Sequence, residues 1–510
     1  MSVTTARGVA RNILFSSITQ AWALLLSLVS IRIVVHGLGE DGYGIFAIGS
    51  VLLGYVAFFD FGLTAAVVRS IAIHRASRHF ESVEETIRTA FAALIVLGLL
   101  GGCILALLTP FLVGGLLHIP PRLRGDATFV FYLASLAFVC NMVLVIFAAI
   151  PQGLQRLDLL SLRNLLLTTF TALGQIAVIE IGGGLRWLAG VSFASNVASL
   201  AVFAVLAPRL VPGVRFWPRI SRGALRELGA FGAKRFISQA GVQAVFLLDR
   251  IIVGAFLPIR AVTFYAVPLT ITQKFLVFHG SITNAYFPAA SELHGLRDAR
   301  RMRRLYLTTL KLNAVIILLL VSLVGGFAHP ILDAWLGSSF ATGSEAILVV
   351  LALGYGLTAL VGVSGHLTDA AGHPGWTATY VGAGAVLNVV VSLILVPRIG
   401  AIGAAYALLI QNGVGGLAFL LTVQWRILRL TLGEMVRQLI RPFAAALVVT
   451  AFALLLGPHL HGVIAVLVAL VAGSALYLGL TWALGVWDAR EQQLARETIS
   501  AAILLAWRRK

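Results

Sequence analysis

The chain has 510 residues, of which 59% are hydrophobic and only 11% are charged, and its mean hydropathy is +0.96. Soluble domains are about half apolar and about a quarter charged, so this composition excludes an ordinary soluble protein and predicts a polytopic membrane protein. The net charge of +18 therefore indicates basic cytoplasmic loops and contact with membrane lipids rather than binding to nucleic acid.

Apolar runs of roughly 20 residues recur along the whole chain, and each is long enough for a transmembrane helix. The fold class is therefore predicted to be all-α, with about 14 membrane-spanning helices. The predicted spans are residues 12–36, 44–68, 90–118, 128–150, 164–182, 186–206, 229–254, 262–285, 306–331, 343–365, 375–396, 400–424, 442–457 and 462–484.

The distribution of Lys and Arg between the loops predicts the orientation. Basic residues gather in alternate loops, for example at residues 69–88, 209–226, 297–304 and 426–441. The loops between them contain few, namely Arg122, Arg124, Arg186, Arg260 and Arg398. Because cytoplasmic loops carry an excess of Lys and Arg, both termini are predicted to face the cytoplasm.

A weak internal repeat predicts the domain organisation. The segment from Arg32 to Val35 returns at Arg250 to Val253, an offset of 250 − 32 = 218 residues. Two similar lobes around a central cavity are a recurring plan in transporters, so two pseudo-symmetric six-helix lobes with two further C-terminal helices are predicted. The predicted parts are an N-terminal lobe (1–206), a basic cytoplasmic linker (207–228), a C-terminal lobe (229–424), two additional helices (425–484) and a cytoplasmic tail (485–510).

Polar side chains within the seventh and eighth spans are the candidate substrate-binding residues. A charge at the centre of a span costs about 2.5–3.5 kcal/mol, so each one requires a partner, water or a function. The candidates for a cationic cavity wall are Arg235, Gln239, Gln243 and Arg250, which recur at helical spacing, Lys274 near the middle of the next span, and Arg32. Such a wall would bind an anionic substrate, since guanidinium groups suit phosphate. Arg32 lies near the outer interface, where its side chain could simply extend to the headgroups.

Two acids in predicted spans, Asp60 and Asp249, are candidate counter-charges or ion-coupling groups. The alternative is that Asp249 with Arg250, or Asp60 with Lys274, forms a static ion pair between helices. The sequence indicates no catalytic residue, metal site or cofactor, because the histidines lack ligand spacing and Cys103 and Cys140 fall within apolar runs. Coupling to protons, sodium or the membrane potential is left open.

Five segments together resemble the polysaccharide (O-antigen type) flippase family of the multidrug, oligosaccharidyl-lipid and polysaccharide exporter superfamily. They are residues 37–44, 60–63, 248–254, 335–337 and 388–405. The resemblance implies a non-enzymatic flippase in the bacterial inner membrane. Its substrate would be an undecaprenyl-diphosphate-linked oligosaccharide, moved from the inner to the outer leaflet by alternating access for surface or extracellular polysaccharide synthesis. A polysaccharide polymerase and export proteins are the implied protein partners.

Three other functions remain as alternatives. A multidrug exporter of the same superfamily would need an acidic or aromatic cavity, whereas the predicted one is basic. A flippase for the lipid precursor of peptidoglycan fits the same chemistry. A membrane glycosyltransferase, polymerase or ligase would need a sizeable external loop, and none is predicted here.

Overall fold

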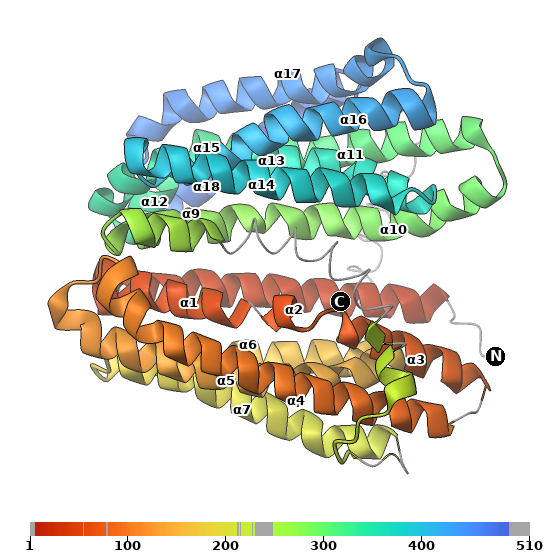
Figure 1. Ribbon diagram of the computed structural model, residues 1–510. Coiled ribbons are helices and arrows are strands. Elements are labelled where there is room, and N and C mark those ends of the chain that lie inside the picture. Colours follow the sequence, from red (N-terminus) through yellow and green to blue (C-terminus); the bar gives the residue numbers. More distant parts are fainter. Residues whose placement is uncertain are drawn as a thin grey trace, which may run out of the picture. The chain divides into compact units, whose positions relative to one another are not determined.

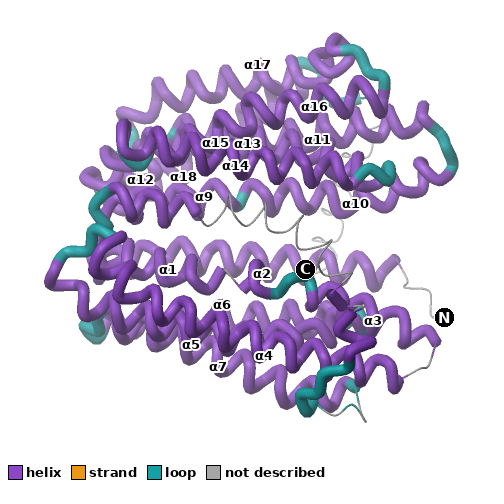
Figure 2. Tube along the Cα trace, viewed as in Figure 1, coloured by secondary structure: helices purple, strands orange, loops and turns teal. Residues whose placement is uncertain are grey.

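The computed structural model describes residues 6–54, 56–77, 80–211, 214, 216–226, 228–229 and 248–488. Figures 1 and 2 show helices over nearly all of this part, joined by loops at the helix ends. Within the described residues, 12 helices are long and apolar enough to cross a membrane. The predicted all-α membrane fold is confirmed, while the predicted span at 229–254 lies largely outside the described residues.

The chain divides into two compact units, one formed by residues 1–267 with 381–407, the other by 268–380 with 408–510. The helices before residue 212 are α1 (Ala6–Gly54), α2 (Val56–Phe59), α3 (Leu63–Ser77), α4 (Phe80–Phe111), α5 (Arg124–Gly153), α6 (Leu157–Glu180) and α7 (Leu185–Leu210). In this first unit α5 packs against both α4 and α7, and α1 packs against α6. The predicted lobe boundaries stay a prediction.

The later helices form most of the second unit, and α9, α14 and α15 run from one unit into the other. They are α9 (Arg260–Gln273), α10 (Phe275–Gly295), α11 (Ala299–Gly326), α12 (Ala328–Leu336), α13 (Ser338–Ala370), α14 (Pro374–Ile399), α15 (Ile402–Ile410), α16 (Leu417–Val423), α17 (Leu432–Leu456) and α18 (Val463–Ala483). Two π-helical segments, Gln411–Gly416 and Gln424–Leu428, precede and follow α16. In this unit α11 packs against α10, α13 and α17.

The first two predicted spans are joined by a kink rather than by a loop. Helix α1 contains a single non-helical residue, Gly39, at φ 71° and ψ 173°. Glycine adopts this positive φ without steric cost. The connection between the predicted spans 12–36 and 44–68 is therefore shorter than expected.

The second predicted span is not one continuous helix. It is interrupted by a turn at residues 60–62, where Phe61 has φ 45° and Gly62 has φ 74°. The prediction of an unbroken helix over residues 44–68 is wrong at this point, because local turn geometry overrides the apolar run. At residues 335–337, Leu336 ends the short helix α12 and Gly337, at φ 96°, joins it to α13.

The two additional C-terminal helices are part of the core of the second unit. Phe327, Val449 and Tyr477 have no exposed surface and contribute to one apolar cluster. They come from the end of α11, from α17 and from α18. Because lipid is as apolar as these side chains, close packing rather than the hydrophobic effect holds such helices together.

Candidate functional site

A buried carboxylate, Asp249, lies where three segments of the first unit meet. It belongs to the helical residues 248–256, and it is only 3% exposed. Its Oδ2 accepts a hydrogen bond from the Tyr265 hydroxyl of α9 at 2.9 Å. Its Oδ1 accepts one from the Ser392 hydroxyl of α14 at 3.1 Å. A carboxylate inside a membrane protein is costly unless it is hydrogen-bonded or paired, so the two hydroxyls stabilise it in place.

The adjacent cation, Arg250, has unused hydrogen-bonding capacity. Its Nε is buried and has no hydrogen-bond partner in the part of the chain that the structure describes. Among the ion pairs found between described residues, none involves Arg250, although Asp249 precedes it. A buried Nε–H without a partner is costly, and it can donate to an anion. Ligand binding by Arg250 and a static pair with Asp249 both stay predictions.

Lys274, the other predicted cation, lies at a break in a long span. Residues 260–295 form one candidate span, and Lys274 separates α9 from α10 near its middle. The preceding residue, Gln273, donates a hydrogen bond to the Tyr355 hydroxyl at 3.3 Å. Interrupted helices near the midplane commonly form the binding sites of transporters. Lys274 belongs to the second unit and Arg250 to the first, so the cavity wall that they were expected to share stays a prediction.

Asp60 lies in the turn that interrupts the second predicted span. Its Oδ1 accepts hydrogen bonds from the Thr64 backbone N–H at 3.0 Å and from the Thr64 hydroxyl at 2.6 Å. These bonds use one carboxylate oxygen to cap the start of α3. The capping role is a structural explanation for Asp60 that stands beside its expected role in ion coupling.

The remaining predicted residues divide into two groups. Arg32 is exposed on α1, which agrees with an interfacial position. Arg235, Gln239 and Gln243 lie outside the described residues. The predicted polar stripe is therefore represented in the structure by Arg250 alone.

A tight contact links α1 and α9 within the first unit. The Thr263 hydroxyl donates to the Glu40 backbone oxygen at 2.5 Å. Gly44 lies so close to the Ile259 backbone oxygen that a Cβ atom would collide with it, and the Thr263 Oγ1 would be 3.1 Å from that Cβ. Nearby, the His118 backbone N–H donates to the Gly254 backbone oxygen at 3.3 Å. The glycine at position 44 is required here by close approach of another backbone.

Lys311 is a charged residue that the sequence analysis did not single out. It lies within α11, is 4% exposed, and its Nζ is 3.5 Å from the Asp488 carboxylate. Its position inside the predicted span 306–331 could have identified it from the sequence. Its partner could not have been identified in this way, because Asp488 is 177 residues away (488 − 311).

Comparison with known proteins gives one family match and several relatives. A family model described as "Polysaccharide biosynthesis protein" matches residues 9–294, more than half of the chain. The "Putative O-antigen transporter" of Shigella flexneri is 24% identical over 399 residues, which cover 78% of this chain and 93% of that protein. The "Uncharacterized membrane protein EpsK" of Bacillus subtilis (strain 168) is 25% identical over 334 residues, covering 63% of this chain and 64% of that protein.

Two solved structures have a similar fold. The lipid II flippase MurJ, in an inward closed conformation, matches with a TM-score of 0.75 at 13% identity, covering 92% of this chain and 98% of MurJ. A multidrug resistance MATE family transporter of the MOP superfamily, in an inward-facing conformation, matches with a TM-score of 0.68 at 17% identity. That match covers 79% of this chain and 94% of the transporter. At these identities the likeness establishes the fold alone.

Proposed function

Because this chain belongs to the polysaccharide biosynthesis protein family, we propose that it is a flippase for lipid-linked oligosaccharides. It moves an undecaprenyl-diphosphate-linked oligosaccharide from the inner to the outer leaflet of the bacterial inner membrane by alternating access. The sugar is then available for surface or extracellular polysaccharide synthesis by a polymerase and export proteins. Both termini face the cytoplasm in this proposal, and the substrate crosses without chemical change.

The observation that carries the proposal is the buried Arg250 Nε without a hydrogen-bond partner among the described residues. A guanidinium group binds diphosphate oxygens through paired, charge-assisted hydrogen bonds. Arg250 follows Asp249 directly, and the hydrogen bonds from Tyr265 and Ser392 to Asp249 hold this part of the backbone in place. The break at Lys274 provides a second cation within a span. The name of the Shigella flexneri relative, an O-antigen transporter, supports the same substrate class.

The two acids, Asp249 and Asp60, are the groups through which ion binding could drive transport. Asp249 binds two hydroxyl groups, and a carboxylate so placed can take up a proton or a sodium ion. In this proposal Asp249 and Asp60 are the candidate ion-coupling groups. Ion uptake at Asp249 would neutralise the negative charge beside Arg250 and so favour binding of the diphosphate, and loss of the ion would favour its release.

The test uses the purified chain in proteoliposomes with a fluorescent undecaprenyl-diphosphate-linked oligosaccharide in one leaflet. We expect the wild type to move the probe, and Arg250→Gln to slow transport by about tenfold or more, the value of one charged hydrogen bond. Arg437→Gln serves as the control, because Arg437 is an exposed arginine of α17. Wild-type transport by Arg250→Gln would refute the binding role.

A substrate panel separates the remaining functions. Lipid II, the peptidoglycan precursor, and an organic cation are offered to the same proteoliposomes. Movement of lipid II alone would make the chain a flippase for the peptidoglycan precursor. Movement of the cation alone would make it a multidrug exporter.

A further inference from the structure

The segment between α16 and α17 forms a sharp elbow at a basic end of the second unit. The π-helical segment Gln424–Leu428 ends at Arg429, whose backbone is left-handed at φ 52° and ψ 41°. The Leu430 backbone N–H then donates to the Gln424 backbone oxygen at 3.0 Å. A left-handed conformation costs a residue with a side chain of the order of 1 kcal/mol or more. This elbow therefore holds Arg429 in a position that a relaxed chain would not favour.

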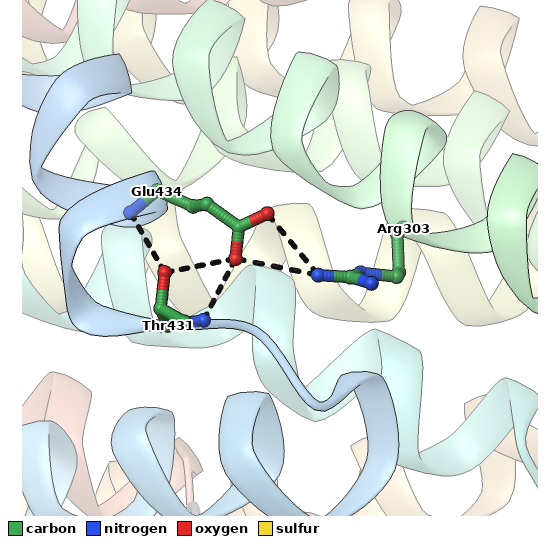
Figure 3. Close-up of polar contacts among 3 residues, drawn as sticks. All are labelled: Arg303, Thr431 and Glu434. Carbon is green, nitrogen blue, oxygen red and sulfur yellow. Dashed lines mark hydrogen bonds and ion pairs between the residues drawn. The ribbon is translucent and has the colours of Figure 1, made fainter.

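Hydrogen bonds hold the far side of the elbow in place (Figure 3). The Glu434 backbone N–H donates to the Thr431 hydroxyl at 3.3 Å, and Thr431 N–H donates to Glu434 Oε2 at 2.8 Å. Together they form a capping box at the start of α17. The Arg303 guanidinium of α11 donates to both Glu434 carboxylate oxygens, at 3.1 and 3.3 Å. The elbow is thus tied to α11.

A second tie from α11 holds the near side. Gln424 is 2% exposed, and its amide donates to the Tyr306 hydroxyl at 3.1 Å. Tyr306 is fully buried. Because both sides of the elbow are bound to α11, the surface between them is preformed.

Beside this elbow is a hollow whose lining combines apolar, aromatic and basic side chains, as is typical of the membrane–water interface. The hollow has a volume of ≈ 630 Å³ and is lined by Leu421, Trp425, Arg429 and Leu432 among others. Trp425 is 76% exposed, and tryptophan is enriched at headgroup level in membranes. The Arg429 guanidinium makes no hydrogen bond or ion pair with any residue of the described chain. Its charge is available for an anionic group.

A second hollow follows along α17, and its lining is apolar throughout. It has a volume of ≈ 410 Å³ between α11, α13, α15 and α17. On α17 it is lined by Val436, Leu439, Ile440 and Phe443. At about 100° per residue these side chains share one face with Leu432 of the first hollow. Val436, Ile440 and Phe443 are about half exposed, so this face is open to the surrounding hydrocarbon.

The two hollows together match the dimensions of a lipid in one leaflet. From Leu432 to Phe443 the helix rises about 16 Å, at about 1.5 Å per residue. A single leaflet provides about 15 Å of hydrocarbon, half of the bilayer core. Basic headgroup contacts attract the anionic lipids of the cytoplasmic leaflet. A basic pocket followed by an apolar groove of this length is complementary to a phosphate-headed lipid with ordinary acyl chains.

We propose that the elbow at Arg429 and the groove along α17 form a binding site for an anionic phospholipid. The phosphate contacts Arg429 and the interfacial Trp425, and one acyl chain lies against Ile440 and Phe443. The bound lipid covers the side of α17 and stabilises its packing on α11. This site is separate from Arg250 and does not depend on the proposed transport function.

The experiment measures lipid binding to the purified full-length chain by native mass spectrometry. The probes are dioleoyl phosphatidylglycerol and dioleoyl phosphatidylcholine, which share acyl chains and differ in net charge. We expect one tightly held phosphatidylglycerol, and about tenfold weaker binding of it by Arg429→Gly. Glycine accepts φ 52° without strain, so this variant removes the guanidinium group and keeps the elbow.

Two further variants test the parts of the site. Leu357 lines the apolar groove, and Leu357→Trp replaces its side chain by a bulkier indole ring. We expect this variant to weaken phosphatidylglycerol binding as well. Arg437→Ala is the matched control, since Arg437 lies about 140° around α17 from Leu432 and does not line either hollow. We expect wild-type binding by this control.

Four results would overturn the proposal. The first is equal retention of phosphatidylcholine and phosphatidylglycerol, and the second is unchanged binding by Arg429→Gly. The third is displacement of phosphatidylglycerol by inorganic phosphate alone, which would leave the groove without a role. The fourth is preferential binding of undecaprenyl diphosphate at this site, which would assign it to the transported lipid instead.

Discussion

The contact between Gly44 and α9 allows a quantitative prediction for Gly44→Ala. The added methyl group collides with the Ile259 backbone oxygen and lies 3.1 Å from the Thr263 Oγ1. A backbone atom cannot rotate away, so we expect an overpacking cost of about 1–3 kcal/mol. Displacement of α9 also weakens the Thr263 to Glu40 hydrogen bond of 2.5 Å, worth about 1 kcal/mol. Alanine returns about 1 kcal/mol of helix propensity, which leaves a net destabilisation of about 1–3 kcal/mol.

The matched control for this prediction is Gly190→Ala in α7. Gly190 is also helical, but a Cβ atom there would meet no heavy atom within 4 Å. Alanine at this position should stabilise the protein by up to about 1 kcal/mol. Both variants are compared with the wild type by reversible unfolding in mixed detergent micelles. Equal stability of Gly44→Ala and Gly190→Ala would refute the close approach of α1 and α9.

Three further predictions concern the apolar core and the two acids, Asp249 and Asp60. Tyr265→Phe removes the hydroxyl that donates to Asp249 and should lower the free energy of unfolding by about 1–3 kcal/mol. Tyr406→Phe is the control and should change stability little, because the Tyr406 hydroxyl makes no hydrogen bond in the described part of the chain. Phe327→Ala empties a fully buried position, with an expected loss of about 3–5 kcal/mol; a loss below about 1 kcal/mol would show that the cluster is not packed as described. Asp60→Asn should change the dependence of transport on pH or sodium in proteoliposomes, and an unchanged profile would leave Asp60 with its capping role alone.

The long apolar runs and the spacing of the basic loops were enough to predict an all-α membrane protein. Length and hydropathy determine membrane insertion locally, because each span must satisfy its own backbone hydrogen bonds. The breaks at Asp60 and Lys274 were not predicted. An interruption depends on a few turn residues and on the partners of the freed backbone groups, which an apolar pattern does not reveal.

The residues of the candidate site could be identified from the sequence only in part. The sequence singled out Asp249 and Arg250 because charges are rare inside spans. It gave no indication that the Tyr265 and Ser392 hydroxyls bind Asp249, since Ser392 is 143 residues away. Ordinary hydroxyl residues of apolar helices become informative only when the fold brings them to a charge.

The sequence by itself determined the membrane class, the family and the residues whose charge needs an explanation. Only the tertiary structure decided which charges are satisfied: Asp249 is hydrogen-bonded, and the Arg250 Nε has no partner among the described residues. The physical reason is that desolvation acts on each residue through its own span, whereas hydrogen bonding depends on side chains that other helices supply.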